Sequence, residues 1–239
     1  MNICDFKKTR LIDDAEKIFL EDKTYAIILS SPSLLESKNG DFINSHDYVI
    51  RFNFAPTGNF EKYVGSKTTH RFLGGVRGAS TYYKEPQDIN VVRWVTGNGC
   101  KKQHNDSLRY IQQDFNNYKK YPEFFNNFYY MACDNYVKHN CYKYNAGYKI
   151  LSSIKYVNRH VNIFGYRDNK KYDKYHYYDD RNNMMNALKI MHKYSLDDVN
   201  PWEGVVRSAS IQKAYKNHPY KDTDILIKKL SSERKINII

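Results

Sequence analysis

Two histidines in the second half of the chain carry the side chains best suited to move protons. His176 opens the run His-Tyr-Tyr-Asp-Asp, and His192 precedes Asp197 by five residues. An imidazole has an unperturbed pKa of about 6.5, so it can accept or donate a proton near neutral pH. Two interpretations without catalysis stay open. His176 could belong to a tyrosine-rich surface loop, and His192 could interact with the negative end of a helix dipole at the helix C-terminus.

Two further segments have the character of ligand-binding loops. Residues 48–53 are rich in β-branched and aromatic side chains, which predicts a strand that ends at Asn53. Ligands collect beyond the carboxyl ends of strands in open α/β sheets, and an amide there suits a nucleotide or a sugar. Further along, Gly147 precedes an amphipathic helix. The first N–H groups of that helix could bind an anion, or Asn145 simply caps it.

The elements that must position these residues alternate along the chain between strand and helix patterns. This alternation predicts the α/β class, as a single Rossmann-like domain over residues 1–239 with a mostly parallel twisted sheet flanked by helices. Amphipathic helices are expected at residues 107–121, 148–158 and 181–192. The strands are expected at residues 25–30, 48–53, 68–73, 90–96, 128–133 and 160–166.

The composition is that of a globular, basic protein. Apolar residues make up 41% of the chain and the net charge is +12, so the protein attracts anions. The 38 lysines and arginines are scattered, and no helix-turn-helix or zinc-finger pattern is present, which argues against nucleic acid as a partner. A nucleotide-sugar donor, an acidic glycan or peripheral contact with an anionic membrane surface fits the charge equally well.

The two ends of the chain have distinct patterns. Residues 1–22 are expected to form a polar amphipathic helix, without the apolar region of a signal peptide. Residues 223–239 are basic and predict either a final helix packed on the domain or a surface that touches lipid headgroups. No run approaches the roughly 20 apolar residues that span a bilayer. With four cysteines that lack metal-site spacing, these features favour a cytoplasmic protein of bacterial or viral type.

The run SHDYVIRFNFAPTGNFEKYVGSKTTHRF, residues 45–72, resembles the large sialylmotif of the animal-type sialyltransferases, which transfer sialic acid from CMP-sialic acid. The resemblance extends back through AIILSSPSLLES, residues 26–37. Three further motifs follow in the family's order: YNAGYKILSSIKYVNRHVNIFGYRDN resembles the small sialylmotif, HYYDD the third motif, and His192 with Asp197 the very short motif His-x4-Glu. The likeness covers roughly residues 24–75 and 144–200.

The resemblance implies a role for each matched residue and a variant nucleotide-sugar glycosyltransferase fold. His192 would be the catalytic base that deprotonates the acceptor hydroxyl, and His176 would assist departure of CMP by contacting the donor phosphate. Asp179 and Asp197 would support the two histidines. The substrate-binding residues would be Ser30, Ser31, Asn53, Gly74, Asn145, Ala146, Gly147, Tyr166, Tyr175 and Tyr178.

The function implied is inverting transfer of sialic acid from CMP-sialic acid to a hydroxyl of a glycan or glycolipid, without metal or other cofactor. Asp222-Thr223-Asp224 has the Asp-x-Asp form of metal-dependent transferases, but it follows no clear strand, so we interpret it as a helix cap. A CMP-sugar carries one phosphate, which leaves less charge for a metal ion to offset.

The sequence also departs from the family's pattern. Asn145-Ala146 stands where the family has two hydroxyl side chains, which keeps open a different CMP-activated acidic sugar such as Kdo. A second alternative is a non-catalytic basic protein on the same fold that binds glycan or nucleic acid. Tyr25 or Ala26 and Asn158 occupy the places of the family's disulfide partners. Animal members carry a membrane anchor in the Golgi, so a Golgi location is expected only if a preceding anchor has been removed.

Overall fold

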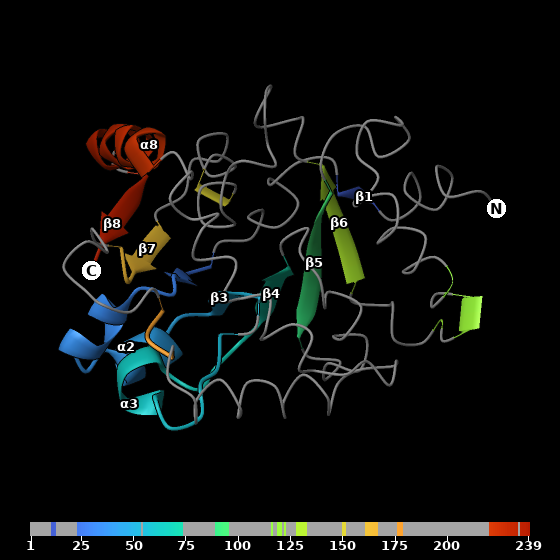
Figure 1. The fold of residues 1–239 in the computed structure, drawn as a ribbon, viewed down its shortest axis with the longest axis horizontal. Coiled ribbons are helices and arrows are strands. Elements are labelled where there is room, and N and C mark those ends of the chain that lie inside the picture. The colour runs from blue at the N-terminus through green and yellow to red at the C-terminus, as the bar shows by residue number, and fades with distance from the viewer. Residues whose placement is uncertain are drawn as a thin grey trace.

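The structure is a computed structural model, and it describes a defined part of the chain. The described residues are 11–12, 23–53, 55–73, 89–95, 116, 119–120, 122, 128–132, 150–151, 161–166, 176–178, 220–233 and 235–239. Its centre is an eight-stranded sheet in which each described pair of neighbouring strands is parallel (Figure 1).

The strands cross the sheet in an order that differs from their order along the chain. From one edge to the other they are β1 (Leu11–Ile12), β6 (Phe128–Ala132), β5 (Asn90–Val95), β4 (His70–Leu73), β3 (Tyr48–Phe52), β2 (Tyr25–Ile28), β7 (Val161–Phe164) and β8 (Ile236–Ile238). The described helices are the 3₁₀ helix η2 (Pro32–Glu36), α2 (Gly40–Asn44), α3 (Glu61–Val64) and α8 (Tyr220–Ser232).

The strand order reverses at β2. From β2 the chain adds β3, β4, β5 and β6 successively on one side, and it then returns to place β7 on the other side of β2. In open α/β sheets, ligands bind outside the carboxyl ends of the strands at such a reversal. The topology therefore points to the carboxyl ends of β2 and β7 as the ligand edge.

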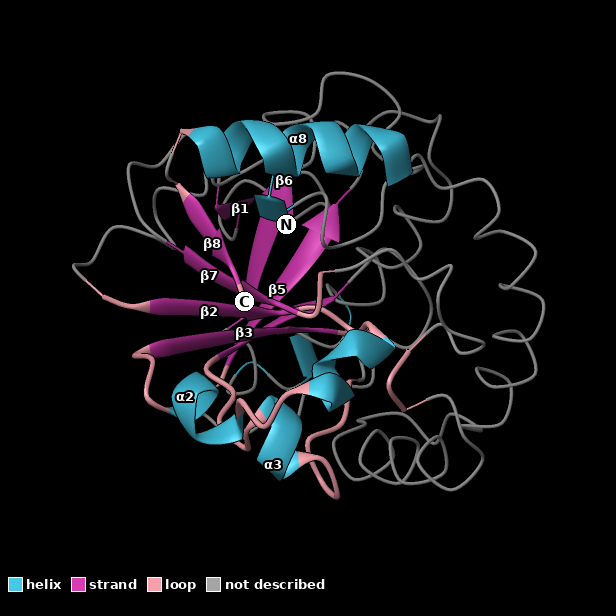
Figure 2. Ribbon diagram, turned by 90° about the vertical axis from the view of Figure 1, so that its left-hand side faces the viewer, coloured by secondary structure: helices cyan, strands magenta, loops and turns pink. Residues whose placement is uncertain are grey.

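Successive side chains of a strand point to opposite faces of the sheet. Around β2, both faces are apolar and described helices pack on each of them. Tyr25 and Ile27 face a core that also contains Ile227 and Leu230 of α8. Ala26 and Ile28 face a second core, which contains Leu34 of η2, Ile43 of α2, Val64 of α3 and Tyr177. Figure 2 shows the result, with α8 above the strands and α2 and α3 below them.

The predicted α/β class and all six predicted strands are confirmed, each to within two residues at either end. The helix expected at 148–158 is confirmed at Ile150 and Leu151, which are helical and fully buried. Asn116, Lys119 and Lys120 are helical within the segment expected at 107–121. The helix expected at 181–192 lies outside the described residues.

Two predictions for the chain ends are wrong in part. Residues 1–22 were expected to be helical, yet Leu11–Ile12 form a strand parallel to β6. The segment 223–239 is a packed helix only as far as Ser232, and Ile236–Ile238 then pair with β7 as an edge strand. Short apolar segments of Leu and Ile fit either a helix or a strand. Here they form strands because each pairs with an available edge of the sheet.

No helix within the described ranges has both the length and the apolar character to cross a bilayer. The cytoplasmic location stays a prediction.

Candidate active site

The site begins where β2 ends. Leu29 donates its N–H to the carbonyl of Phe164, 3.0 Å away, which keeps the end of β2 against β7. Ser31 then caps η2: its buried Oγ accepts from the N–H of Ser33 at 3.2 Å and from the Ser33 hydroxyl at 3.1 Å. The chain thus turns away from the sheet directly after Ser30, whose main-chain carbonyl lies at the ligand edge.

Asn53 ends the neighbouring strand, β3, in an unusual backbone conformation. Its φ is +46°, in the left-handed region that asparagine tolerates better than most residues. The N–H of Asn53 donates to the carbonyl of Phe72 at 2.8 Å, and its carbonyl accepts from Nη1 of Arg71 at 2.9 Å. Two bonds to β4 therefore fix the main chain of Asn53, and the strand turns sharply at this point.

His176 reaches the same edge from far along the chain. The next residue, Tyr177, donates its N–H to the carbonyl of Ser30 at 3.0 Å, and its hydroxyl donates to the carbonyl of Pro56. The turn of residues 176–178 is thereby bonded both to the end of β2 and to the loop that follows β3.

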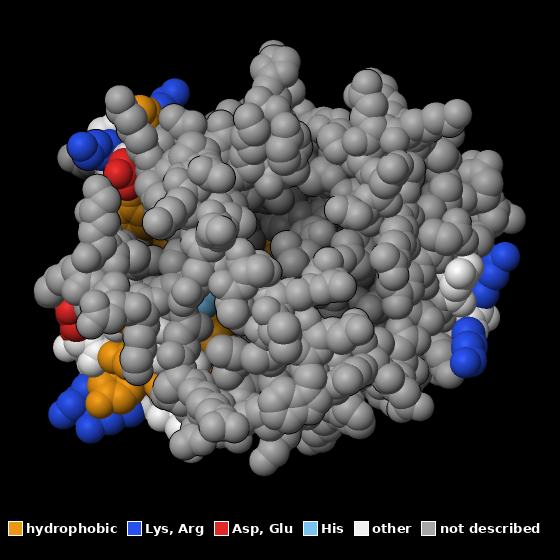
Figure 3. Space-filling model, in the orientation of Figure 1, with side chains coloured by type: hydrophobic (Ala, Val, Ile, Leu, Met, Phe, Trp, Pro, Cys, Tyr) orange, Lys and Arg blue, Asp and Glu red, His pale blue; other side chains and the backbone are white. Residues whose placement is uncertain are grey.

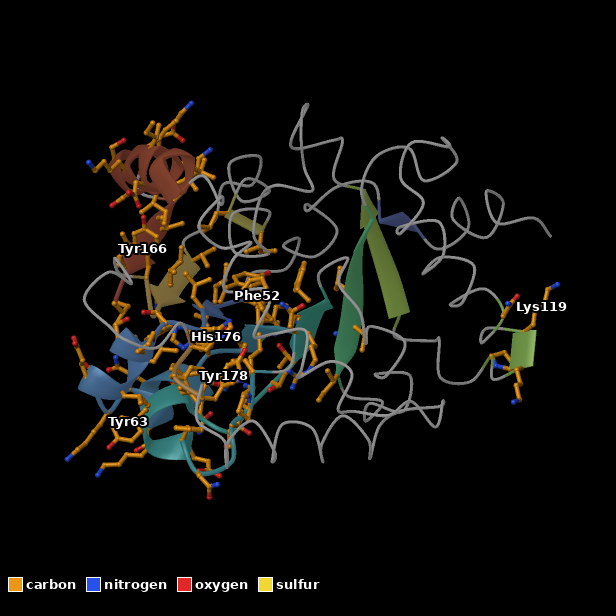
Figure 4. The ribbon with its side chains drawn as sticks, in the orientation of Figure 1. Phe52, Tyr63, Lys119, Tyr166, His176 and Tyr178 are labelled. Carbon is orange, nitrogen blue, oxygen red and sulfur yellow. The ribbon has the colours of Figure 1, made fainter. Side chains whose placement is uncertain are left out.

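The imidazole of His176 is stacked on the ring of Tyr178. Their ring centres lie 4.8 Å apart and their planes are 11° from parallel. Figure 4 labels both residues, side by side, and Figure 3, in the same orientation, shows pale blue histidine surface on this face of the molecule. His176 and Tyr178 are half-buried, so the imidazole is held by the protein and still reaches the surface.

Positive charge lies in the core beneath this edge. Arg51 and Arg71 are register partners on β3 and β4, and both are buried. Arg51 donates to the carbonyls of Val64 (2.7 Å), Gly65 (3.1 Å) and Lys67 (2.9 Å). Burial lowers the pKa of Arg51 to about 10, which still leaves the guanidinium charged at neutral pH. These two charges favour an anionic ligand at the strand ends.

The Tyr177 phenol is protonated in this environment. Burial raises the pKa of Tyr177 to about 12, and the charges of Arg51 and Arg71 oppose that shift only in part. The phenol is therefore a hydrogen-bond donor at any physiological pH, as its bond to the Pro56 carbonyl requires.

At the end of β7 the chain makes a close contact that only glycine allows. Gly165 has a φ of +74°, and a Cβ there would lie 2.6 Å from Cγ of Leu34 in η2. Tyr166 follows and donates its hydroxyl to the carboxylate of Asp224 in α8. This bond ties α8 to the end of the strand that borders β2.

The Asp-x-Asp segment differs from its expected position as a helix cap. Asp222 and Asp224 lie inside α8, which begins at Tyr220, so neither is the cap of that helix. No group of three His, Cys, Asp or Glu side chains suited to a metal ion occurs among the described residues. Whether the protein uses a metal ion stays a prediction.

The structure brings together five of the predicted site residues and places a sixth nearby. Ser30, Ser31, Asn53, His176 and Tyr178 gather around the carboxyl ends of β2 and β3, and Tyr166 lies at the end of adjacent β7. The remaining predicted residues, namely Gly74, Asn145, Ala146, Gly147, Tyr175, Asp179, His192 and Asp197, lie outside the described residues.

Sequence reasoning missed three residues that hold this site. Arg51 interrupts the otherwise apolar strand β3 and Arg71 lies beside it on β4; a charged residue on a buried strand is a signal that something nearby must pair with it. Tyr177 belongs to the HYYDD run itself, but the sequence does not distinguish its buried ring from that of half-buried Tyr178.

Comparison with known proteins shows the family and the fold. The family model described as glycosyltransferase family 29 (sialyltransferase) matches residues 10–200. A bovine beta-galactoside alpha-2,6-sialyltransferase 2 is 34% identical over 106 residues, which is 42% of this chain and 21% of that protein. A pig CMP-N-acetylneuraminate-beta-galactosamide-alpha-2,3-sialyltransferase 1 is 48% identical over 58 residues, 24% of this chain and 17% of that protein.

These alignments span only about a fifth of the length of the curated relatives. The fold is similar over a longer stretch. The crystal structure of a mammalian sialyltransferase superposes with a TM-score of 0.56 at 19% identity, covering 100% of this chain and 79% of that one.

Proposed function

The chain belongs to glycosyltransferase family 29, the sialyltransferases, and we propose that it transfers sialic acid from CMP-sialic acid to a hydroxyl of a glycan or glycolipid. The reaction inverts the configuration at the anomeric carbon and needs no metal ion. The acceptor oxygen forms a bond to the anomeric carbon as the bond from that carbon to the phosphate oxygen of CMP breaks.

The observation that carries the proposal is the position of His176. Its turn is bonded to the carbonyls of Ser30 and Pro56, so the imidazole lies at the carboxyl edge where β2 meets its neighbours. This is the edge at which the strand order predicts a ligand. A half-buried imidazole placed there can donate a hydrogen bond to a phosphate oxygen.

His176 would act on the leaving group. Negative charge builds on the phosphate oxygen as CMP departs, and a positioned N–H donor stabilises that charge in the transition state. Removal of one such donor typically lowers the rate about 100- to 1000-fold. The buried charges of Arg51 and Arg71 favour the same anion from below.

His192 would act on the acceptor. A hydroxyl is a poor nucleophile, and a base that takes its proton during attack contributes about 100- to 10,000-fold. In the proposed reaction the proton passes to His192, and Asp197 supports that imidazole. Asn53, with its main chain fixed at the end of β3, is proposed to contact the nucleotide.

The test is release of CMP from CMP-sialic acid by purified protein, with water or a glycan as acceptor. We expect release by the unaltered chain and its loss in His192→Ala and in His176→Ala. Tyr63→Phe, a change in helix α3 outside the site, serves as the control and should retain the activity.

Other outcomes would overturn the proposal. Release of CMP from CMP-Kdo but not from CMP-sialic acid would assign a different donor sugar. Binding to heparin or DNA that CMP does not displace, with no release from either donor, would favour a non-catalytic binding protein. A rate that is unchanged in both histidine variants would remove the assigned roles.

A further inference from the structure

We propose that Tyr177 is a positioning residue that holds the imidazole of His176 against the carboxyl edge of the sheet. The inference rests on the proposed function, because Tyr177 would act only through His176 and touch no substrate.

Tyr177 is anchored at three places in the chain. Its N–H bonds to the carbonyl of Ser30 at the end of β2, and its hydroxyl bonds to the carbonyl of Pro56 in the loop after β3. Its ring meets the ring of Phe60, next to α3, edge-on at 5.0 Å between ring centres. The side chain is 2% exposed, so it is enclosed on every side by the structure.

The anchor is transmitted to His176 by a chain of ring contacts. The ring of Tyr177 packs edge-on against Tyr178, with centres 4.9 Å apart and planes 86° apart. The ring of Tyr178 in turn carries the stacked imidazole of His176 at 4.8 Å. The imidazole is thus fixed twice: through the backbone of the adjacent residue, and through the Tyr178 ring that Tyr177 supports.

The hydroxyl of Tyr177 is the part of this anchor that can be removed alone. Phenylalanine at this position keeps the backbone bond to Ser30 and the ring contacts with Phe60 and Tyr178, and loses the bond to Pro56. That bond joins residues separated by 121 positions in the chain, and both partners are buried. Its loss releases the turn from the β3 loop while the core remains filled.

The expected effect falls on the chemical step. A shift of a catalytic group by about 1 Å can lower a rate on the order of 100-fold. We expect Tyr177→Phe to lower kcat for CMP release from CMP-sialic acid by about 10- to 100-fold, with a much smaller change in KM. The matched control is Tyr63→Phe, whose ring packs on the same core cluster from α3. It should leave kcat and KM unchanged.

A double-mutant cycle separates positioning from general weakening of the fold. If Tyr177 acts through His176, then Tyr177→Phe has almost no further effect once His176→Ala is present, because coupled residues are not additive. The proposal would be overturned if Tyr177→Phe lowered kcat by the same factor in the unaltered chain and in His176→Ala. An unchanged kcat in Tyr177→Phe would also overturn it. If Tyr177→Phe does not fold, Phe60→Leu offers a second test, because it loosens the contact with the Tyr177 ring. Its effect on kcat is also expected to disappear when His176→Ala is present.

A readout without turnover keeps this inference distinct from the proposed function. The ¹⁵N chemical shifts of the His176 imidazole, and the exchange rate of the Tyr177 amide that bonds to Ser30, report the anchor directly. We expect both to change in Tyr177→Phe and neither to change in Tyr63→Phe. Unchanged values in Tyr177→Phe would refute the positioning role, even if the protein released CMP. Changed values in a protein without activity would refute the proposed function alone.

Discussion

The two ends of the same strands are built differently. At the amino ends of β2, β3, β7 and β8, polar side chains bond to one another. At the carboxyl ends of β2 and β3, the bonds that join distant segments of the chain include several to the main-chain atoms of Ser30, Asn53 and Pro56. At the amino edge, polar side chains therefore stabilise the fold. At the carboxyl edge, bonds to main-chain atoms fix the path of the chain.

Two pairs of contacts illustrate the amino edge. The carboxylate of Asp47 accepts both the N–H and the hydroxyl of Thr24 at 2.9 Å, and the Thr24 hydroxyl accepts the N–H of Asp47. Buried His46 bonds through Nδ1 to the carbonyl of Phe42 and through Nε2 to Asn162, whose own amide oxygen accepts from Asn237.

His46 and His176 illustrate the consequence of this difference for a histidine side chain. Nδ1 of His46 must donate, because its partner is a carbonyl, so Nε2 must accept from the Asn162 amide; both nitrogens serve the fold. His176 instead lies half-buried on the Tyr178 ring at the edge where the topology predicts a ligand. The different surroundings of His46 and His176 thus follow from the strand ends at which they lie.

Arg51, in the core beneath the carboxyl edge, gives the largest expected effect. Substitution by methionine fills the space but leaves the buried carbonyls of residues 64 and 65, and the part-buried carbonyl of residue 67, without this donor. Each buried acceptor that loses its partner costs about 1–3 kcal/mol, so we expect a loss of at least about 2 kcal/mol in the free energy of unfolding. Urea unfolding measures it. A loss below about 1 kcal/mol would mean that Arg51 is not structural.

His176→Ala tests the carboxyl edge. CMP release from CMP-sialic acid should fall about 100- to 1000-fold, because a donor to the leaving phosphate is lost. The melting temperature should remain close to that of the unaltered protein, since the anchors of the turn belong to Tyr177. Comparable losses of stability and activity would contradict the separation between the two edges.

His46→Leu is the matched test at the amino edge. It leaves buried acceptors and the Asn162 amide without this partner, at about 1–3 kcal/mol in the free energy of unfolding. The rate of CMP release per folded molecule should stay within about twofold, because His46 lies at the opposite strand ends. A large fall in kcat at unchanged stability would place His46 in the chemistry.

The smallest effect is the pH dependence at Asp47. Hydrogen bonds from the backbone and then the side chain of Thr24 hold the pKa of this carboxyl below its usual 3.8. The carboxylate therefore stabilises the fold fully above pH 3.8, and this contribution is lost as the pH falls through the lower pKa of the folded state. Asp47→Asn should flatten the acid side of a plot of melting temperature against pH. An unaltered acid limb would contradict the assignment.

Six of the eight strands and part of the carboxyl edge follow from local sequence patterns. The β-branched and aromatic residues of 48–52 predict a strand, and the turn residues that follow, from Asn53 to Gly58, predict its end. The grouping of His176 with Tyr178 is also local, since the two lie two residues apart. The HYYDD motif therefore contained two of the five residues that gather at the site before any fold was known.

The anchor at Tyr177 and the two strands at the chain ends depend on tertiary contacts. The bond from Tyr177 to Pro56 joins residues separated by 121 positions, and no local pattern distinguishes that tyrosine from its neighbour. The strands at Leu11–Ile12 and Ile236–Ile238 exist because β6 and β7 offered them a partner. Strand pairing and burial depend on contacts between distant segments, whereas the periodicity that a sequence displays reports only on a residue's immediate neighbours.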